Sequence, residues 1–542
     1  MMSSPEIDWL QRKWGLPEGA VKPVLDLIRE ERSGSTACEI TDRITDWGRA
    51  VGPAEDSSPL VVVGHEGKSY LQSRRLYCAE REIATRILEL AGKEAGLPGA
   101  GEPIPGLFPE AEEDDRQVEA ARVAMSRRLV VITGGPGTGK THTLARILAL
   151  FVAAGIQPDS IRLAAPTGKA ADRMKKAVGD SLAGLPENFK ETLESLERIA
   201  GSSSTLHALL GYNPDTGRCR FDARRPLSCD VLIVDECSMV DVFLWRALLQ
   251  ALPASSRLVL LGDPNQLESV GQGNLFAELV RTAGVAGSQL HPAHVHLTEA
   301  RRFKDRPDIL AFARALENSD AEAAVKLLEG TLANKGSRGL VWLQTSGRSL
   351  ACAEYPQTVL DALETVAQSG SAPEALAALG KICILTAQRE YFVGSLATSA
   401  AIDQYFARRQ GVRNQPVIIN HNDPETGLRN GTIGVIHTSA DGRRMAWFPA
   451  GGGFLKDFPV AKLPDFSPAW AITIHRSQGS EYDDVLVFLP RGESPMATRE
   501  LLYTAITRAR HNVWVAGDLD AVRKAAATGS SRTTLAGIHL LE

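Results

Sequence analysis

The sequence of 542 residues has no uninterrupted apolar run of about 18 residues, so it offers no candidate for a membrane-spanning helix. Its first residues, MMSSPEIDWLQRKWG, have neither the basic start nor the apolar stretch of a secretion signal. The seven cysteines include no CxxC pair, so neither a zinc site nor an iron–sulfur cluster is indicated. Scattered single thiols in a chain without such a signal favour a reducing compartment, and we expect a cytoplasmic protein.

A large excess of charge of one sign is also missing, because the net charge is −5. The molecule as a whole is not a polycation, so nucleic-acid binding would require a local basic groove. The share of apolar residues is 44% and that of charged residues is 23%, which is ordinary for a soluble globular protein. No tandem repeat of fixed period is visible, and the length predicts about three or four domains.

Changes in pattern divide the chain into parts. Residues 1 to about 95 mix helical patterns with a strand-like run, and a Gly/Pro-rich and then acidic linker follows, GLPGAGEPIPGLFPEAEEDD. Apolar runs then alternate with helical patterns and predict a doubly wound parallel sheet: LVVITGG, IRLAAPTG, DVLIVDE and RLVLLGDPNQ. A second α/β pattern begins near residue 300. Within it, residues 413–465 form short strand-like runs separated by turns, which predict a small inserted β module.

The stretch GGPGTGKT has the spacing of a phosphate-binding loop, with an apolar strand before it and an amphipathic helix after it. Glycines let backbone N–H groups turn toward phosphates without a Cβ in the way. Lys140 would place its charge near the β and γ phosphates, and Thr141 can coordinate Mg²⁺. We therefore predict a nucleotide and Mg²⁺ site made by Gly134, Gly135, Pro136, Gly137, Thr138, Gly139, Lys140 and Thr141.

Two more strands of the same predicted sheet end in polar residues. Asp235 and Glu236 follow the apolar run VLIV, where Asp235 would hold Mg²⁺ and Glu236 would orient and deprotonate the attacking water. Gln266 follows the next strand and is placed to respond to the γ-phosphate. Ligands of such sheets bind at the carboxyl ends of the strands, so we expect these side chains to converge with the phosphate loop.

The full set of motifs resembles that of superfamily 1 helicases, and most of all the RecD branch, the α subunit of exodeoxyribonuclease V. The motifs run in the family's order: GGPGTGKT, AAPTGKAA, TLHALLG, VDECSM, GDPNQLESVG, ARRF, TIHRSQGSEYDD and LLYTAITRAR. The resemblance implies an α/β fold with two RecA-like P-loop domains, parallel sheets, a small N-terminal domain and an inserted SH3-like β module. The expected bounds are 1–110, 111–300 with a hairpin insertion at about 211–227, and 301–542 with the module at about 413–465.

The resemblance also assigns roles in the first domain. Gln117 matches the glutamine that reads the adenine edge, and a solvated residue at a helix start is the alternative. Thr167 and Lys169 match residues that contact the DNA backbone, which suits a strand-to-helix turn. Thr205 and His207 match a second DNA contact, although a histidine packed in the core is nearly as good an interpretation of His207.

In the second domain, Arg302 and Arg508 match the arginines that reach the γ-phosphate, and Arg510 is expected to be solvated at a helix end. Glu481 matches a residue near the ribose or the DNA. The chain departs from the family pattern at Arg476, where lysine is usual, and at REYFVG, where REGPFG-like residues are usual.

These matches imply an ATP- and Mg²⁺-dependent DNA helicase that moves 5′ to 3′ on single-stranded DNA, without sequence preference, as a subunit of a RecBCD-type exodeoxyribonuclease in double-strand break repair and recombination. RecB-like and RecC-like subunits would be its partners, and residues 1–110 would dock on them. One alternative is a stand-alone RecD-like helicase, although such proteins carry a longer N-terminal region. The other is an ATP-binding regulatory subunit that does not move on DNA.

Overall fold

The computed structural model of the chain describes residues 5–41, 44, 46–52, 57–94, 96–97, 107–108, 115–182, 184–185, 190–299, 303, 305–331, 339–345, 350–391, 393–409, 411–450, 454–490, 494 and 496–541. The chain forms two compact units. The first comprises residues 1–264, 268–299 and 531–542, and the second comprises residues 265–267 and 300–530. Among the described residues, every helix is too short or too polar to cross a membrane.

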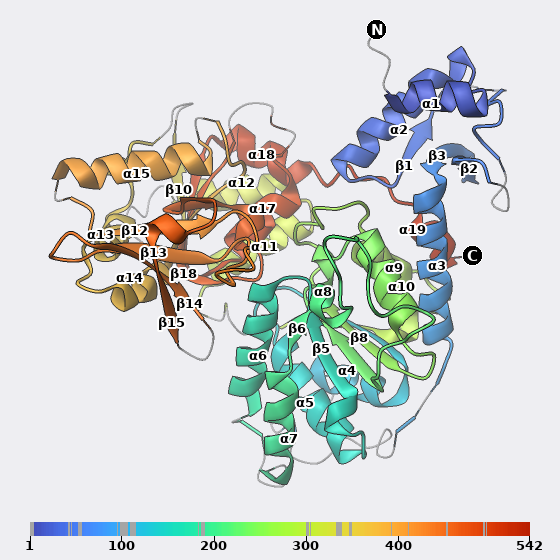
Figure 1. Cartoon of the computed structure of the whole chain (residues 1–542), viewed down its shortest axis with the longest axis horizontal. Helices are drawn as coiled ribbons and strands as arrows, with labels where there is room; N and C mark the ends of the chain where they lie inside the picture. The colour runs from blue at the N-terminus through green and yellow to red at the C-terminus, as the bar shows by residue number, and fades with distance from the viewer. Residues whose placement is uncertain are drawn as a thin grey trace. The chain divides into compact units, whose positions relative to one another are not determined.

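The first unit begins with a small α/β subdomain, blue in Figure 1. Its helices and strands are α1 (Pro5–Trp14), α2 (Val21–Ser33), β1 (Ala37–Ile40), β2 (Leu60–His65) and β3 (Lys68–Ser73). The strands form an antiparallel sheet in the order β1-β3-β2. The two-residue turn between β2 and β3, Glu66-Gly67, has φ angles of 49° and 78°, which match the twist of a tight hairpin.

A six-stranded parallel sheet in the order β6-β5-β7-β8-β4-β9 forms the centre of the first unit. Its strands are β4 (Leu129–Gly134), β5 (Ile161–Ala165), β6 (Ser204–Thr205), β7 (Val231–Val234), β8 (Arg257–Gly262) and β9 (His294–Leu297). The surrounding helices are α3 (Arg74–Ala91), α4 (Arg116–Ser126), α5 (Lys140–Ala153), α6 (Gly168–Leu182), α7 (Lys190–Gly201), α8 (Leu206–Leu209), α9 (Val242–Ala251) and α10 (Leu275–Ala283). The parallel sheet predicted from the apolar runs is confirmed.

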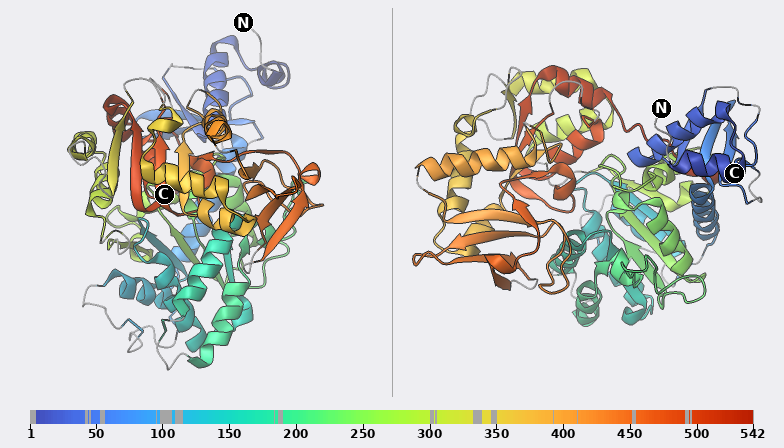
Figure 2. Two further views of the ribbon diagram at one scale, coloured as in Figure 1. Left: turned by 90° about the vertical axis from the view of Figure 1, so that its left-hand side faces the viewer. Right: turned by 45° about the horizontal axis from the view of Figure 1, so that its top comes forward.

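Helices cover both faces of this sheet. Successive strand residues point to opposite faces, so Val130 and Ile132 join one core and Leu129 and Val131 join another. Helices α4 to α7 pack on the first face, and α3, α9 and α10 pack on the second. Figure 2 shows α6 and α7 running side by side. Each apolar strand is therefore buried on both sides, as its uninterrupted apolar pattern requires.

The second unit contains a five-stranded parallel sheet in the order β10-β19-β18-β11-β17. Its strands are β10 (Leu340–Gln344), β11 (Ile382–Thr386), β17 (Ala471–Thr473), β18 (Tyr482–Phe488) and β19 (Ala509–Gly517). Its helices are α11 (Pro307–Glu317), α12 (Ala321–Gly330), α13 (Gln357–Gln368), α14 (Ala372–Leu379), α15 (Ser395–Arg409), α16 (Ile474–Ser477), α17 (Arg499–Ile506) and α18 (Leu519–Ala527).

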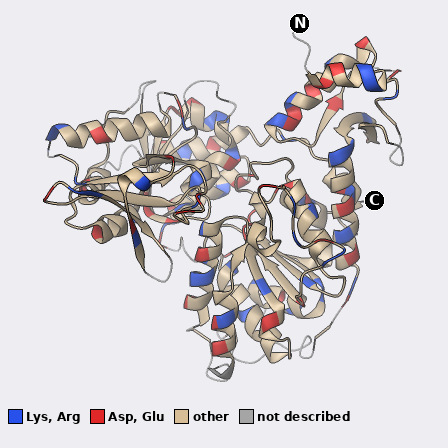
Figure 3. Cartoon of the chain, in the orientation of Figure 1, with Lys and Arg blue, Asp and Glu red and all other residues tan. Residues whose placement is uncertain are grey.

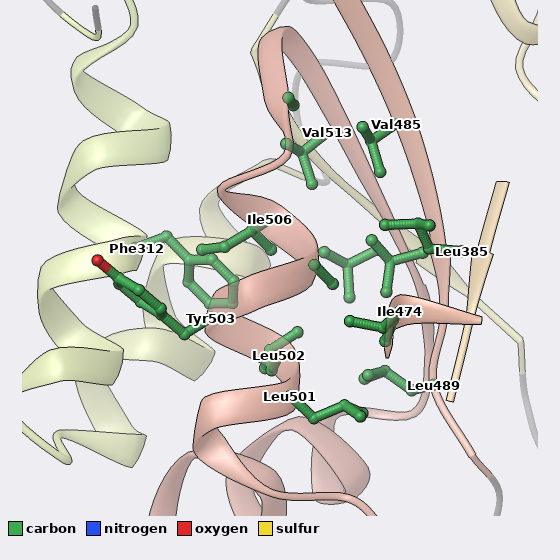
Figure 4. Close-up of a cluster of buried hydrophobic side chains, with 14 of the residues drawn as sticks. Phe312, Leu385, Ile474, Val485, Leu489, Leu501, Leu502, Tyr503, Ile506 and Val513 are labelled. Carbon is green, nitrogen blue, oxygen red and sulfur yellow. The ribbon is translucent and has the colours of Figure 1, made fainter. Parts of the chain in front are cut away.

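The two faces of this second sheet again carry separate cores. Val485 and Val513 face a cluster that includes Leu502 and Ile506 of α17, and Figure 4 shows these side chains together. In the same cluster Tyr503 packs near Phe312, and its hydroxyl donates a hydrogen bond to Glu317 (2.9 Å). The two parallel sheets with helices on both faces confirm the predicted α/β fold class.

The insertion in the second unit is an antiparallel sheet in the order β15-β14-β13-β12-β16. Its strands are β12 (Asn414–Ile419), β13 (Ile433–Thr438), β14 (Arg444–Pro449), β15 (Leu455–Pro459) and β16 (Phe466–Pro468). Gly434 lies against the ring of Phe448 with no room for a Cβ, so the two strands approach closely there. The position agrees with the expected module at 413–465, and its likeness to an SH3 domain stays a prediction.

Residues 211–227, expected as a hairpin insertion, form an irregular loop. One antiparallel bridge joins Asn213 and Arg218, and the Asn213 side chain accepts hydrogen bonds from the backbone N–H groups of Asp215 (2.8 Å) and Thr216 (3.2 Å). Gly217 completes the turn with a φ angle of 65°. The turn expected at these residues is therefore present, although the flanking residues do not extend into regular strands.

The last residues of the chain return to the first unit, although the expected bounds placed them with the second domain. Arg532 forms an ion pair with Glu268 (2.7 Å) and donates hydrogen bonds to the carbonyls of Ser269 (2.7 Å) and Gly271 (2.9 Å). Thr534 donates to the buried carboxylate of Glu80 (2.6 Å). Helix α19 (Ala536–Leu541) then packs against α3 and α10, which adds the C-terminal segment to a core that sequence position alone does not predict.

Candidate nucleotide site and nucleic-acid contacts

The phosphate loop connects the end of β4 to the start of α5. Gly137 and Gly139 have φ angles of 79° and 85°, which residues with a Cβ rarely adopt. A Cβ on Gly134 would lie 2.6 Å from Thr138 Oγ1 and 2.8 Å from the Leu297 carbonyl, so the loop has no room for one. The loop thus presents backbone N–H groups at the N-terminus of a 14-residue helix, which is a favourable place for phosphate.

Lys140 lies across this loop. Its Nζ donates hydrogen bonds to the carbonyls of Gly134 (2.5 Å) and Gly135 (3.0 Å). Burial lowers the pKa of Lys140, and the nearby carboxylates of Asp263, Glu236 and Asp235 oppose that shift. The ammonium is therefore held by neutral carbonyls within reach of three acids. Thr141 follows in the first turn of α5, so its hydroxyl lies at the same helix start.

Asp235 and Glu236 follow the last residue of β7, as predicted. Burial raises the pKa of Asp235 to about 6, and the neighbouring Glu236 adds to the shift. The Asp235 carboxylate accepts a hydrogen bond from the Glu236 backbone N–H (2.8 Å). Glu236 has a φ angle of 54°, which is uncommon for a residue with a Cβ and is typical of functional sites. Arg173 Nη1 lies 3.5 Å from Glu236 Oε1.

Gln117 lies in the first turn of α4, where Asp115 caps the helix by accepting a hydrogen bond from the Gln117 N–H (2.7 Å). The side chain is 5% exposed, so the alternative of a solvated residue is wrong. Its Nε2 donates to the Thr138 carbonyl (3.4 Å) and lies 2.5 Å from the position of a Cβ added on Gly139. Gln117 therefore packs on the phosphate loop, and its recognition of adenine stays a prediction.

The residues predicted to touch DNA lie at the ends of two neighbouring parallel strands, β5 and β6. Thr167 caps α6 by accepting a hydrogen bond from the Ala170 N–H (3.2 Å), and Lys169 lies in the first turn of that helix. Thr205 caps α8 in the same way (3.1 Å to the Ala208 N–H). His207 is exposed and its ring packs edge-on against Tyr212, so the alternative of a core histidine is wrong.

In the second unit, Arg508 is 2% exposed. Its guanidinium donates hydrogen bonds to Gln266 Oε1 (3.0 Å) and to the carbonyls of Thr504 (3.1 Å) and Ser480 (3.3 Å). Gln266 follows β8 in sequence but belongs to the second unit. The next residue, Leu267, is fixed there as well, because its N–H donates to Thr504 Oγ1 (2.8 Å) and its carbonyl accepts from Gln478 Nε2 (3.1 Å).

The structure distinguishes the neighbouring arginines. Arg510 is exposed and pairs with Glu481 (3.4 Å) and Asp483 (4.0 Å), so Glu481, predicted to lie near the ribose or the DNA, has an arginine beside it. Arg476 donates to Asn420 Oδ1 (3.1 Å). Arg302 lies outside the described residues.

Sequence reasoning missed two residues of the nucleotide site. Asp263 is 1% exposed and follows β8 directly, so the rule that selected Asp235, an acid after a buried strand, also selects it. Arg173 had no such signal. It lies inside α6, and only the side-by-side pairing of β5 and β7 brings its helix to Glu236.

Comparisons with known proteins define first the class and then the family. Residues 117–272 match the family described as AAA domain, and residues 468–516 match the UvrD-like helicase C-terminal domain. Together with a phosphate loop on the first of two parallel-sheet units, these matches make the chain a helicase of superfamily 1.

The RecBCD enzyme subunit RecD of Mycolicibacterium smegmatis is 36% identical over 85% of this chain and 80% of its own length. The RecD subunit of Mycobacterium tuberculosis H37Rv is 33% identical over 90% of this chain and 83% of its own. The chain therefore belongs to the RecD family. The ATP-dependent RecD2 DNA helicase of Deinococcus radiodurans is 29% identical over 88% of this chain and 59% of its own length. The solved Pif1 helicase from Candida albicans, 16% identical over 76% of this chain and 97% of that one, gives a TM-score of only 0.40.

The packing of Gln117 on Gly139 gives a prediction. Gly139→Ala is expected to weaken ATP binding about tenfold or more, because the new Cβ would lie 2.5 Å from Gln117 Nε2 and the φ angle of 85° disfavours it. Gly155→Ala is the matched control, since Gly155 has a φ angle of 91° but no atom within 4 Å of an added Cβ. Titration of both variants with a fluorescent ATP analogue measures the difference. Equal affinities would contradict the packing argument.

Proposed function

We propose that this chain couples ATP hydrolysis to 5′-to-3′ movement along single-stranded DNA and unwinds duplex DNA. The observation that supports this most is the grouping of Lys140, Asp235 and Glu236 at one edge of the parallel sheet in the first unit. Membership of the RecD family and the name of the D. radiodurans relative, an ATP-dependent DNA helicase, support the reaction and its energy source.

The phosphate loop is proposed to bind the triphosphate. Backbone N–H groups at the start of α5 point to the phosphate oxygens, and Lys140 exchanges its two carbonyl acceptors for the β and γ phosphates. Gln117, buried beside Thr138 and Gly139, would hold the base. Because the loop has no room for a Cβ, this cradle fits a phosphate chain bound through the backbone.

A magnesium ion would fit beside the loop. The Thr141 hydroxyl and the Asp235 carboxylate are oxygen ligands of the kind that Mg²⁺ prefers, and its role when bound is to neutralise charge on the phosphate oxygens. Glu236 would orient the attacking water and accept its proton. Gln266, Arg302 and Arg508 are proposed to respond to the γ-phosphate, as the family resemblance assigns.

DNA is proposed to lie over the loops that follow β5 and β6. Thr167 and Lys169 stand at the start of α6, and Thr205 and His207 stand at the start of α8. Helix starts and a lysine suit phosphates and carry no sequence information. Binding should therefore be independent of sequence and weaken with salt.

The function is tested by ATP hydrolysis with and without single-stranded DNA. The full chain is expected to hydrolyse ATP, and oligo(dT) is expected to accelerate the reaction. Lys140→Gln should lower the rate about 100-fold or more in both conditions, because a neutral amide cannot stabilise the charge on the phosphates. An absence of ATPase activity with and without DNA would reject the motor and favour a non-translocating regulatory subunit.

The two arginines of TRAR should differ in effect. Arg508→Ala is expected to lower single-turnover hydrolysis by about 10³-fold while ATP still binds, because a cation that stabilises the transition state is lost. Arg510→Ala should change the rate only a few-fold, since Arg510 is exposed and pairs with Glu481. Arg508 is buried, so thermal melting of each variant serves as the control for folding. Equal losses of rate in the two variants would show that Arg508 and Arg510 do not have different roles in hydrolysis.

We also propose that the chain is a subunit of a RecBCD-type exodeoxyribonuclease that acts in double-strand break repair and recombination. The relatives of higher identity carry that subunit name, at 36% and 33%, against 29% for the RecD2 helicase. RecB-like and RecC-like chains should then co-purify with it from its own cells. Isolation of the chain alone, with full unwinding of long duplexes by the chain by itself, would favour the stand-alone helicase.

A further inference from the structure

Arg173 touches the side chain proposed to activate water. Its Nη1 lies 3.5 Å from Glu236 Oε1, and its charge also acts on Asp235 and Lys140. The Arg173 side chain is 35% exposed, whereas that of Glu236 is 9% exposed. A partly solvated arginine therefore reaches in to a buried carboxylate. At 3.5 Å this is a longer contact than a strong charge-assisted hydrogen bond, so it can break at little cost.

Hydrogen bonds hold the backbone of Glu236, so only its side chain can change direction. The N–H of Glu236 donates to Asp235 Oδ1 (2.8 Å), its carbonyl accepts from the Met239 N–H (3.1 Å), and its φ angle is 54°. With the main chain pinned on both sides, the position of the carboxylate depends on what its oxygens contact. Arg173 holds one of those oxygens, and a carboxylate oxygen held by a guanidinium is less available to a water molecule.

The same helix links Arg173 to the proposed DNA contacts. Helix α6 has 15 residues, begins at Gly168 and is capped by Thr167. Lys169 and Arg173 are four residues apart, so they share one face of the helix, separated by about 6 Å along its axis. Figure 3 shows basic residues on this helix. A small displacement of the start of α6 would therefore move Arg173 relative to Glu236, whose backbone is fixed by other contacts.

We propose that Arg173 restrains Glu236 until single-stranded DNA engages the start of α6. In the absence of DNA, the guanidinium keeps the carboxylate turned toward α6. When a DNA phosphate binds at Thr167 and Lys169, α6 shifts, the contact loosens, and Glu236 turns to the attacking water. Arg173 is in this view a positioning residue, which acts on hydrolysis through Glu236. The inference rests on the proposed function, because it assumes that the chain is a DNA-stimulated ATPase.

The test is the ratio of ATPase rates with and without saturating oligo(dT), measured on the full chain. Arg173→Ala is expected to raise the DNA-free rate about five- to tenfold, within the range of typical allosteric couplings, and to leave the DNA-stimulated rate within about twofold of the original. The ratio therefore falls. Lys176→Ala is the matched control, because Lys176 is an exposed cation on the same helix. Its ratio should equal that of the unchanged chain.

A second pair of variants separates restraint from simple destabilisation. Arg173→Ala combined with Glu236→Gln should be inactive with and without DNA, because the raised basal rate passes through Glu236. Arg173→Lys keeps the charge and should restore part of the stimulation by DNA. Loss of packing alone does not predict the partial return of stimulation in Arg173→Lys, and thermal melting of each variant checks that α6 remains folded.

The results distinguish this inference from the proposed function. If oligo(dT) stimulates the unchanged chain and Lys140→Gln is inactive, the function stands. Equal losses in both conditions for Arg173→Ala, or an unchanged ratio, would then overturn the restraint alone. If the unchanged chain hydrolyses no ATP, both proposals fail.

Discussion

The charged side chains at the carboxyl edge of the first sheet set a condition that the order of its strands has to meet. Lys140 lies near Asp235, Glu236 and Asp263, where β4, β7 and β8 end. Burial lowers the pKa of Lys140 and raises that of Asp235 to about 6. Ionised groups persist in such a place only when opposite charges and hydrogen bonds compensate them. The strand order β7-β8-β4 supplies that compensation by placing three polar strand ends side by side.

The segment that follows β8 passes briefly into the second unit and then returns to the first. After Asp263, residues 265–267 belong to the second unit, where Gln266 accepts a hydrogen bond from Arg508. Residues 268–273 belong again to the first unit, where Arg532 binds the Glu268 carboxylate and the following carbonyls. Both ends of the segment are thus held by arginines far away in sequence.

The sequence was enough to predict the parts of the site that neighbouring residues form. It was not enough to predict contacts between residues far apart in the chain. The phosphate loop and the polar strand ends follow from a few neighbouring residues, because glycine conformation and strand alternation are local properties. The contact of Arg173 with Glu236 depends on which strands are neighbours, and the return of Arg532 to Glu268 depends on the path of the whole chain. The exposure of His207 was also unpredictable, since a short helix with one histidine fits a core as well as a surface.

The TRAR stretch shows how tertiary structure can separate residues that a motif presents as alike. In a regular strand, Arg508 and Arg510 would point to the same face, because they are two residues apart. Arg508, however, precedes β19 and is buried against Gln266. The pairing of β19 with β18 shifts at this point, because Tyr482 pairs with Ala509 but Asp484 pairs with Asn512. One residue of β18 therefore lies opposite two residues of β19, Arg510 and His511. Such a bulge redirects side chains. Arg510 beside it is exposed and meets Glu481 and Asp483, whereas Arg508 is the arginine of this pair that contacts the segment following β8.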